Sequence, residues 1–489
     1  MLTGLKVILC CGTCLMLLGG QTILSAEASL PQPHPTHQAD WRWIHGAVFV
    51  PTSAVNEAQQ WDEYDPVIND RELHYASIYG INCVRVYLHY LIYLKDKEQL
   101  LKNIEDFLTR ADKYGIKVEF VFFDDCWHEP AQEILKANYR YPNPIFGVHN
   151  SRWLLSPGHD VLLHYEAHRE RLKAYLQDIV SAHKEDPRIV FWETYNEPKT
   201  QTPGILKLIQ EAQLWVHETG TTIPVTATGG DAHYCGDSYS DFLTWHHYNH
   251  NYSFSADPVH ALNTESMCRK EQNVPDLVAH WKGKTGFIVW EFGIGRDNCR
   301  FYWGETAGQP AAAEHEKPFH GLVFADGHPW STNDIAAWLG AEAYAQLPVY
   351  HVTYFRDMTF TTAAKASITP AIDFDLQDEI GYGSPDTSIH LPKDHYSIRW
   401  TGEVVSPENG PTRLHVKSDG AVKIFVNSQL VINKAKGSRP EATGDVKLFP
   451  GKPATITVEY THETGQASLH LGWISMAGEQ KILFPVSHP

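Results

Sequence analysis

Residues 188–198 read RIVFWETYNEP, an apolar run that ends in the polar sequence Asn196-Glu197-Pro198. A short, continuous apolar run bounded by turn residues is typical of a strand buried in a parallel sheet. Burying a carboxylate at the end of such a strand costs free energy, so its presence there indicates a chemical use. The stretch therefore predicts a parallel α/β fold with a functional group at the carboxyl end of this strand.

The same alternation of strand and helix extends in both directions from this stretch. We expect seven further strands, at residues 43–50, 81–90, 116–125, 223–230, 242–248, 286–293 and 320–330. Helical periodicity separates them, as in residues 65–80, where Asp65 can cap the helix and Pro66 lies in its first turn. Eight strands, nearly all followed by helices, predict a (β/α)8 barrel over residues 41–346. The competing doubly wound sheet would carry a Gly-rich phosphate turn after an early strand, and the sequence has none.

Residues 348–489 have a different sequence pattern. The runs TRLHVKSDGAVKIFVNSQLVIN (412–433) and ATITVEYTHETGQASLHLGWIS (454–475) alternate apolar and polar residues with a period of two. Turn signals such as Asp419-Gly420 and Gly465 interrupt them. This part of the chain is therefore predicted to be an antiparallel β-sandwich.

The first 28 residues have the composition of a secretory signal peptide. Lys6 provides a positive flank, an apolar run follows, and Ala26-Glu27-Ala28 places small residues where cleavage requires them. Residues 29–40 are rich in Pro and His and are expected to form a flexible leader. The apolar run is too short and too interrupted to span a membrane. We therefore expect a secreted or periplasmic protein, with a lipid anchor on a cysteine of the run as the alternative.

Composition and charge narrow the range of partners. The formal net charge is −18, from 40 Lys+Arg against 58 Asp+Glu. Nucleic acids and anionic membranes require clustered positive charge, so neither is expected as a partner. Aromatic residues make up 12% of the chain, and their faces stack on sugar rings as readily as they fill protein cores. A neutral polysaccharide is compatible with this balance.

Five cysteines follow the signal peptide, and none lies in a C-x-x-C pair, so no structural zinc site is expected. Cys83 lies in a predicted strand and is expected to be a buried, inert thiol. Because the fifth cysteine, Cys126, makes the number odd, at least one thiol is expected to be free. In an exported protein, two of the loop cysteines Cys235, Cys268 and Cys299 could form a disulfide.

Barrel active sites lie at the carboxyl ends of the strands, so we asked which polar residues occupy those ends. They are Arg85, His89, Asp124, Asp125, Trp127, Asn196, Glu197, His246, His247, Tyr248, Glu291, Asp326, His328 and Trp330. A metal site in the HHYNH run is not expected, because adjacent strand residues point to opposite faces.

Glu197 and Glu291 are the important pair among these residues. They end the predicted fourth and seventh strands, which lie across the barrel mouth from each other. One carboxyl group can protonate a glycosidic oxygen while the other attacks the anomeric carbon. A separation of roughly 5–5.5 Å makes such a mechanism retaining. A lone glutamate at a strand end is commonly a surface ion pair, whereas two opposed glutamates point to glycoside hydrolysis.

TYNEP (194–198) and VWEFG (289–293) resemble the strand-four and strand-seven signatures of clan A glycoside hydrolases, the 4/7 superfamily. The resemblance covers residues 41–346 and implies that Glu197 is the acid/base and Glu291 the nucleophile. It also implies that Asn196 binds the sugar 2-hydroxyl. Further implied roles are Arg85 as the arginine that orients the nucleophile, His246 and Tyr248 as a His-x-Tyr motif, and Trp330 as the subsite floor. His89, Asp125 and Trp127 complete the candidate substrate-binding residues.

The C-terminal region resembles a PA14 module, through VTYFRDMTF (352–360), IDFDLQD (372–378), YSIRWTGEV (396–404) and VKIFVNSQLVI (422–432). Some such modules bind sugars through calcium held by paired aspartates. This sequence shows no such pair, so the resemblance leaves a structural role and a binding role open.

Together these features predict a retaining β-glycoside hydrolase that acts on a β-linked oligo- or polysaccharide and needs no cofactor or metal. Xylan-, glucan- and galactan-type linkages remain open. A transglycosylase of the same fold, an inactive carbohydrate-binding protein and a metal-dependent barrel hydrolase are the alternatives. The opposed acid pair argues against the inactive protein, because binding alone does not require it.

Overall fold

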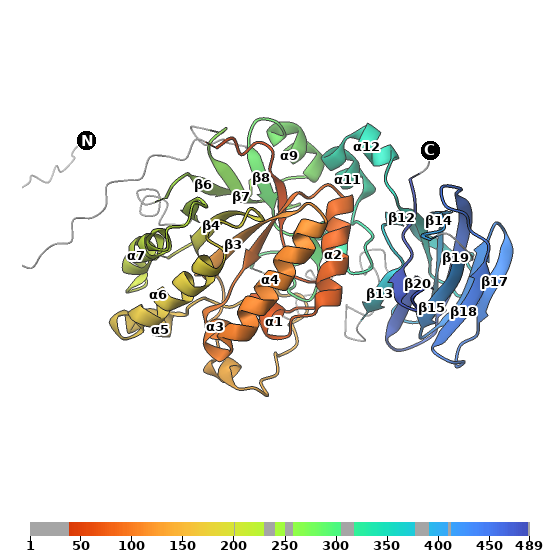
Figure 1. The fold of residues 1–489 in the computed structure, drawn as a ribbon, viewed down its shortest axis with the longest axis horizontal. Helices are drawn as coiled ribbons and strands as arrows, with labels where there is room; N and C mark the ends of the chain where they lie inside the picture. Colours follow the sequence, from red (N-terminus) through yellow and green to blue (C-terminus); the bar gives the residue numbers. More distant parts are fainter. Residues whose placement is uncertain are drawn as a thin grey trace, which may run out of the picture.

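The computed structural model describes residues 39–199, 201–228, 240–249, 258–304, 317–376, 391–408 and 412–487. The predicted signal peptide, nearly all of the leader and Cys235 lie outside these residues. The described chain forms an N-terminal barrel with surrounding helices and a C-terminal sandwich of antiparallel sheets, side by side in Figure 1. The predicted fold class is confirmed.

The barrel is a parallel sheet of eight strands within the described residues, hydrogen-bonded in the order β5-β4-β3-β2-β1-β8-β7-β6. Its two end strands meet where Asp241 N donates to Val225 O at 2.8 Å and Thr226 Oγ1 donates to Phe242 O at 3.1 Å. The strands are β1 (His45–Val48), β2 (Cys83–Tyr87), β3 (Lys117–Asp124), β4 (Ile189–Asn196), β5 (Val225–Thr228), β6 (Thr244–His247), β7 (Leu262–Ser266) and β8 (Gly286–Val289).

Helices cover the outside of the barrel (Figure 1) and bury their apolar faces against it. As predicted, Asp65 caps α2 by accepting from Val67 N and Ile68 N, and Ser331 caps α11. The helices are α1 (Glu57–Asp62), α2 (Pro66–Ile78), α3 (Tyr90–Lys95), α4 (Lys97–Lys113), η1 (Gln132–Leu135), α5 (His159–Leu163), α6 (Tyr165–Ala182), α7 (Ile205–Glu218), α9 (Val274–Trp281), α11 (Thr332–Leu339) and α12 (Ala341–Ala345).

The seventh barrel strand differs from the prediction. It is β7, whose sequence LNTES contains one apolar residue, although all five residues are buried. The stretch predicted as strand seven is therefore β8. The stretch predicted as strand eight contains only the two-residue β10 (Val323–Phe324), which pairs with β9 (Gly293–Ile294) outside the barrel sheet. A polar strand inside the barrel lacks the apolar run by which strands are recognised in a sequence.

Two antiparallel sheets build the sandwich and enclose a second apolar core. One sheet has the order β12-β11-β14-β19-β16-β17, and the other has the order β13-β20-β15-β18 with β21 beside β20. The strands are β11 (Tyr350–Phe355), β12 (Ala363–Thr369), β13 (Asp373–Leu376), β14 (Tyr396–Val404), β15 (Thr412–Ser418), β16 (Ala421–Val426), β17 (Gln429–Lys434), β18 (Glu441–Val446), β19 (Ala454–His462), β20 (Ala467–Ile474) and β21 (Gln480–Ile482).

The barrel and the sandwich share a polar contact centred on the buried Asp326. Tyr354 of β11 donates its hydroxyl to Asp326 Oδ2 at 2.6 Å, and Thr369 Oγ1 donates to Asp326 O at 2.9 Å. Four residues (346–349) connect α12 to β11, and Val349 packs into the barrel core. The sandwich is thus joined to the barrel by a short, partly buried connection.

Four described cysteines, Cys83, Cys126, Cys268 and Cys299, are free thiols. Cys83 is fully buried in β2, as predicted. The predicted disulfide is therefore not formed between Cys268 and Cys299. Within the described ranges, no helix combines the length and the apolar character needed to cross a membrane.

Candidate active site

A pocket of about 380 Å³ lies at the carboxyl ends of the barrel strands. Two carboxylates, Glu197 and Glu265, line it together with four tryptophans: Trp127, Trp153, Trp290 and Trp303. Trp127 and Trp303 are 43% and 45% exposed, whereas Trp153 and Trp290 are buried. The pocket therefore has acidic groups at its base and accessible aromatic faces at its rim.

Glu197 follows the last residue of β4 and adopts the left-handed backbone conformation, with φ +41°. This conformation is rare for a residue other than glycine and is concentrated at functional sites. The Glu197 Oε1 atom lies 2.5 Å from His246 Nδ1, and the Cys126 thiol donates to Oε2 at 3.4 Å. Burial disfavours the ionised carboxylate, but the contacts with His246 and Cys126 outweigh burial and lower the pKa of Glu197 to about 2.

Glu265 lies in β7, and three side chains hold its carboxylate. Arg85 NH1 donates to Oε1 at 2.6 Å, and the Tyr87 hydroxyl donates to the same oxygen at 2.8 Å. The Tyr248 hydroxyl donates to Oε2 at 2.7 Å. A carboxylate that accepts from a guanidinium and two phenols is fixed in orientation.

His246 of β6 lies between the two carboxylates. Its Nδ1 atom is 2.5 Å from Glu197 Oε1 and 3.3 Å from Glu265 Oε2. One oxygen of each carboxylate and this nitrogen all lie within 4.8 Å of one another. Burial would lower the pKa of His246, but Glu265 and Glu197 outweigh burial and raise it. The free site therefore favours a protonated imidazole on His246 beside the ionised carboxylate of Glu197.

The expectation that Glu291 faces Glu197 from strand seven is corrected by this geometry. Glu291 follows β8, is 1% exposed and does not line the pocket. Its carboxyl group lies against Asp297, and burial together with that neighbour raises the pKa of Glu291 well above its ordinary value. The error follows from the missed strand β7, which shifts the strand numbering by one.

Five other predicted residues lie in the pocket or at its base. Asn196, Tyr248 and Trp127 line it, His246 joins the carboxylates, and Arg85 lies beneath them, fully buried. Arg85 NH2 also donates to Asn196 Oδ1 at 2.8 Å, which fixes the amide next to the acid/base candidate.

Three predicted residues lie elsewhere. His89 is buried and caps α3, with Nε2 3.1 Å from Leu155 O. Asp125 binds His159 and the backbone N–H of Lys199, at 2.6 and 2.7 Å. Trp330 lines a second pocket, of about 500 Å³, together with residues of α9, α11 and β12. Trp290 lines the pocket that contains Glu197 and occupies the position expected of Trp330, because it follows the true eighth strand.

Asp124 is a site residue that the sequence analysis listed only as a strand end. It accepts from Asn196 Nδ2 at 2.8 Å and from Trp153 Nε1 at 2.6 Å, and so joins two lining residues. Burial raises the pKa of Asp124 to about 7, although both hydrogen bonds oppose the increase. Its place at the carboxyl end of β3 was the available signal, but the neighbouring Asp125 offered the same signal.

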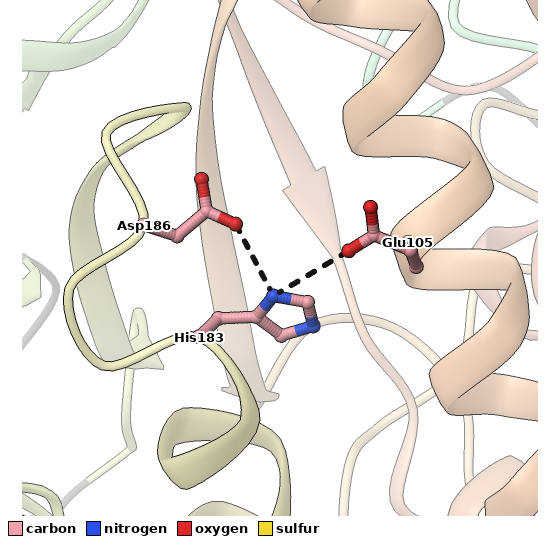
Figure 2. A group of neighbouring side chains, drawn as sticks. All are labelled: Glu105, His183 and Asp186. Carbon is pink, nitrogen blue, oxygen red and sulfur yellow. Dashed lines mark hydrogen bonds and ion pairs between the residues drawn. The ribbon is translucent and has the colours of Figure 1, made fainter.

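Figure 2 shows Glu105 of α4 beside His183 and Asp186, which lie just before the start of β4, at the end of that strand opposite the pocket. The His183 Nδ1 atom is 3.3 Å from Asp186 Oδ2 and 3.9 Å from Glu105 Oε2. Arg188 already binds both acids, at 2.6 and 2.8 Å. The guanidinium occupies the carboxylate oxygens that a metal ion would need, so this cluster fits an ion-pair network at the end of the barrel that serves stability.

Comparison with known proteins places a family match in the sandwich. Residues 348–483 match the model of the PA14 domain. Over 131 residues the chain is 34% identical to the anti-sigma-I factor RsgI3 of Acetivibrio thermocellus. The aligned region makes up 27% of this chain and 19% of that protein. The chain thus spans about a fifth of the length of this curated relative.

Two solved structures are similar to parts of the chain. An anti-sigma factor domain-containing protein has 30% sequence identity and a TM-score of 0.26, covering 29% of this chain and 48% of its own. The GH5_18 protein of Streptomyces cattleya, solved in complex with Manb1-4GlcNAc, has 10% identity and a TM-score of 0.41, covering 61% of this chain and 80% of its own. The chain is therefore a parallel eight-stranded barrel followed by a sandwich that matches the PA14 domain.

Proposed function

We propose that this protein is a retaining β-glycoside hydrolase in which Glu197 is the acid/base and Glu265 the nucleophile. The observation that carries the proposal is the pair of carboxylates in one pocket, with oxygens within 4.8 Å of each other. Such a short separation supports direct attack by one carboxylate, because an inverting pair needs room for a water molecule. Arg85, Tyr87 and Tyr248 donate to Glu265 and hold it in one orientation, as a nucleophile requires.

The reaction proceeds by double displacement. Glu265 attacks the anomeric carbon while Glu197 protonates the departing oxygen, and a glycosyl ester of Glu265 forms. Glu197, now ionised, takes a proton from water, which attacks the same carbon and releases Glu265. Asn196, fixed by Arg85 and Asp124, is placed to bind the 2-hydroxyl of the sugar under attack.

The acid needs a proton that the free site keeps on His246. The 2.5 Å contact between His246 Nδ1 and Glu197 Oε1 is a direct path for that proton. A bound sugar excludes water from the pocket and disfavours the separated charges of the His246–Glu197 pair. The proton then moves to Glu197, which becomes the neutral acid that the first step uses.

The substrate class follows from the pocket rim and the second domain. The exposed faces of Trp127 and Trp303 suit stacking on sugar rings beyond the cleaved bond. A PA14 sandwich beside the barrel supports a carbohydrate ligand. We infer a β-linked oligo- or polysaccharide of xylan, glucan or galactan type, which the protein would meet outside the cytoplasm if the predicted signal peptide directs its export.

Two matched variants test the assignment. Glu265→Gln should lower turnover of aryl β-glycosides by at least about 10⁴-fold, because the amide cannot form the glycosyl ester. Glu291→Gln makes the same substitution outside the pocket and should keep activity within about tenfold of wild type. Circular dichroism of both variants controls for folding. The reverse ranking would reject Glu265 as the nucleophile and restore Glu291.

The alternatives differ in other measurements. An inactive binding protein would retain glycan without turning over any aryl β-glycoside. A transglycosylase would form the same ester but transfer the sugar to an added acceptor rather than to water. A metal-dependent hydrolase would lose activity in a chelator, which a site built on two carboxylates and a histidine should tolerate.

A further inference from the structure

Three glutamates surround one arginine at the centre of the barrel, below the pocket. Arg85 donates from Nε to Glu119 Oε1 at 3.0 Å, from NH2 to Glu193 Oε1 at 2.5 Å, and from NH1 to Glu265 Oε1 at 2.6 Å. Arg85, Glu119 and Glu193 are 0% exposed, and of the three acids Glu265 lines the pocket. The mechanism above uses Glu265 and gives Glu119 and Glu193 no task.

A single guanidinium cannot balance three buried negative charges. Glu119 Oε2 and Glu193 Oε2 are buried, and no donor for either is found in the described part of the chain. Both carboxyl groups accept from the same guanidinium, through Glu119 Oε1 and Glu193 Oε1, so the two acids are neighbours inside the barrel. Two acids in contact share a proton, because both cannot be ionised side by side at low dielectric. That proton gives both remaining oxygens a partner.

The proton belongs to Glu119. Burial raises the pKa of Glu119 well above its ordinary value, and the neighbouring Glu193 adds to the increase. Arg85 lowers the pKa of Glu119, but by less than burial and Glu193 raise it. The titratable groups that face Glu119 are Arg85 and Cys83 of β2 and Glu193 of β4. Glu265 and Tyr87 lie on the other side of Arg85. The four groups at the barrel centre therefore carry one positive and two negative charges, on Glu193 and Glu265.

We propose that Glu193, hydrogen-bonded by a neutral Glu119, is the permanent counter-charge of Arg85 and positions it through the covalent step. This inference rests on the proposed function. In the first step a bond forms between a Glu265 oxygen and the anomeric carbon, the bond to the leaving oxygen breaks, and that oxygen takes the Glu197 proton. The resulting ester of Glu265 is neutral, so Arg85 loses its charged partner on the pocket side.

Glu193 keeps its charge throughout this step. Arg85 therefore remains paired inside the barrel, where an unpaired guanidinium would be costly. With the pair intact, the net charge around Arg85 changes from −1 to zero when the ester forms. Without a charge on Glu193 or Glu119 it would change from zero to +1 in a buried site, and formation of the ester would be disfavoured.

The two acids can be separated by matched variants. Glu119→Gln should behave as wild type, because the amide can donate to Glu193 and accept from Arg85 as the neutral acid does. In Glu193→Gln, Glu119 loses its acidic neighbour and can ionise beside Arg85 in its place. The double variant Glu119→Gln/Glu193→Gln removes both candidates for the counter-charge and should show a loss that neither single variant shows.

The experiment measures the rate of covalent labelling by 2,4-dinitrophenyl 2-deoxy-2-fluoro-β-glycosides of glucose, galactose, mannose and xylose, followed by intact mass. The dinitrophenolate group of these probes departs without being protonated by an acid. The rate of labelling therefore reports attack by the nucleophile alone. We expect Glu119→Gln within about threefold of wild type, Glu193→Gln within about tenfold, and the double variant slower by about 100-fold or more. A purely structural pair would lower the melting temperature of the double variant but leave the labelling rate of its folded fraction at the wild-type value.

The outcomes separate this inference from the proposed function. If no probe labels the wild-type protein, or if the label maps to a residue other than Glu265, the proposed function fails. If wild type is labelled on Glu265 and the folded double variant is labelled equally fast, the counter-charge is rejected. Should the double variant not fold, Glu193→Gln decides. The labelling rate of Glu193→Gln, divided by that of wild type, should decrease between about pH 8 and about pH 5, because in this variant Glu119 must be ionised to supply the counter-charge. A ratio that stays constant with pH would overturn the inference.

Discussion

His246 determines where the proton of the pocket resides. It lies 2.5 Å from Glu197, so this carboxyl group and the imidazole titrate as one unit. In the free site this unit holds one proton, on the imidazole. The group that must act as an acid is thus ionised until substrate enters, and the apparent pKa of activity belongs to the pair of His246 and Glu197.

The pH profile should reveal this sharing. Because the pKa of His246 is raised above 6.5, the unit keeps its proton, and the basic limb of kcat/KM should lie above pH 6.5. In His246→Gln the proton must reside on Glu197 alone and is lost at lower pH. The basic limb should then move down by about one unit or more, and activity near neutral pH should fall about 10- to 100-fold.

His149 provides the control, because it also lines the pocket but is neutral there, burial having lowered its pKa to about 4. His149→Gln should leave the basic limb in place. A limb that stays in place in His246→Gln would show that His246 does not share the acid's proton.

At the scale of single elements, β7 and β4 show what a sequence reveals. RIVFWETYNEP predicts β4 because apolar residues precede its functional end. LNTES does not predict β7, because Asn263, Thr264 and Glu265 fill buried positions of this strand with polar side chains. Seven of the eight barrel strands, Glu197, Asn196, Arg85, His246 and Tyr248 were accessible to pattern reasoning. Glu265 was not, because recognising it requires knowing which strands meet in space.

Gly286 tests how closely β8 packs against β7 and against Trp41, which precedes β1. A Cβ atom there would lie 2.3 Å from Trp41 O and 2.6 Å from Leu262 Cδ1, so neither the backbone nor the core could accept it. We expect Gly286→Ala to destabilise the barrel by about 2–3 kcal/mol, as overpacked cores do. Thermal unfolding would measure the loss.

Gly220→Ala is the comparison variant, because its Cβ would meet nothing within 4 Å. With φ +73°, this variant should cost only about 1 kcal/mol, from backbone strain alone. Equal losses in the two variants would mean that the β7–β8 contact is not tightly packed.

Across the whole molecule, Asp326 joins the two folded parts. Its carboxylate accepts from Tyr354 of the sandwich at 2.6 Å and lies 2.5 Å from His328 Nδ1. Asp326→Ala removes a buried acceptor for both and should cost about 2–4 kcal/mol. Tyr354→Phe deletes one hydrogen bond and should cost about 1 kcal/mol. In calorimetry, the alanine variant should separate one unfolding transition into two, and a single unchanged transition would contradict this role.

The four-residue connection between α12 and β11 has a consequence for how the protein would meet a polymer. A domain on a long linker raises the local concentration of substrate over a wide radius, since it can bind wherever its slack allows. Here Val349 is anchored in the barrel core and no slack remains. If the sandwich binds sugar, it would instead fix a distance along one glycan chain. That distance separates the sugar residue bound by the sandwich from the glycosidic bond that enters the barrel pocket.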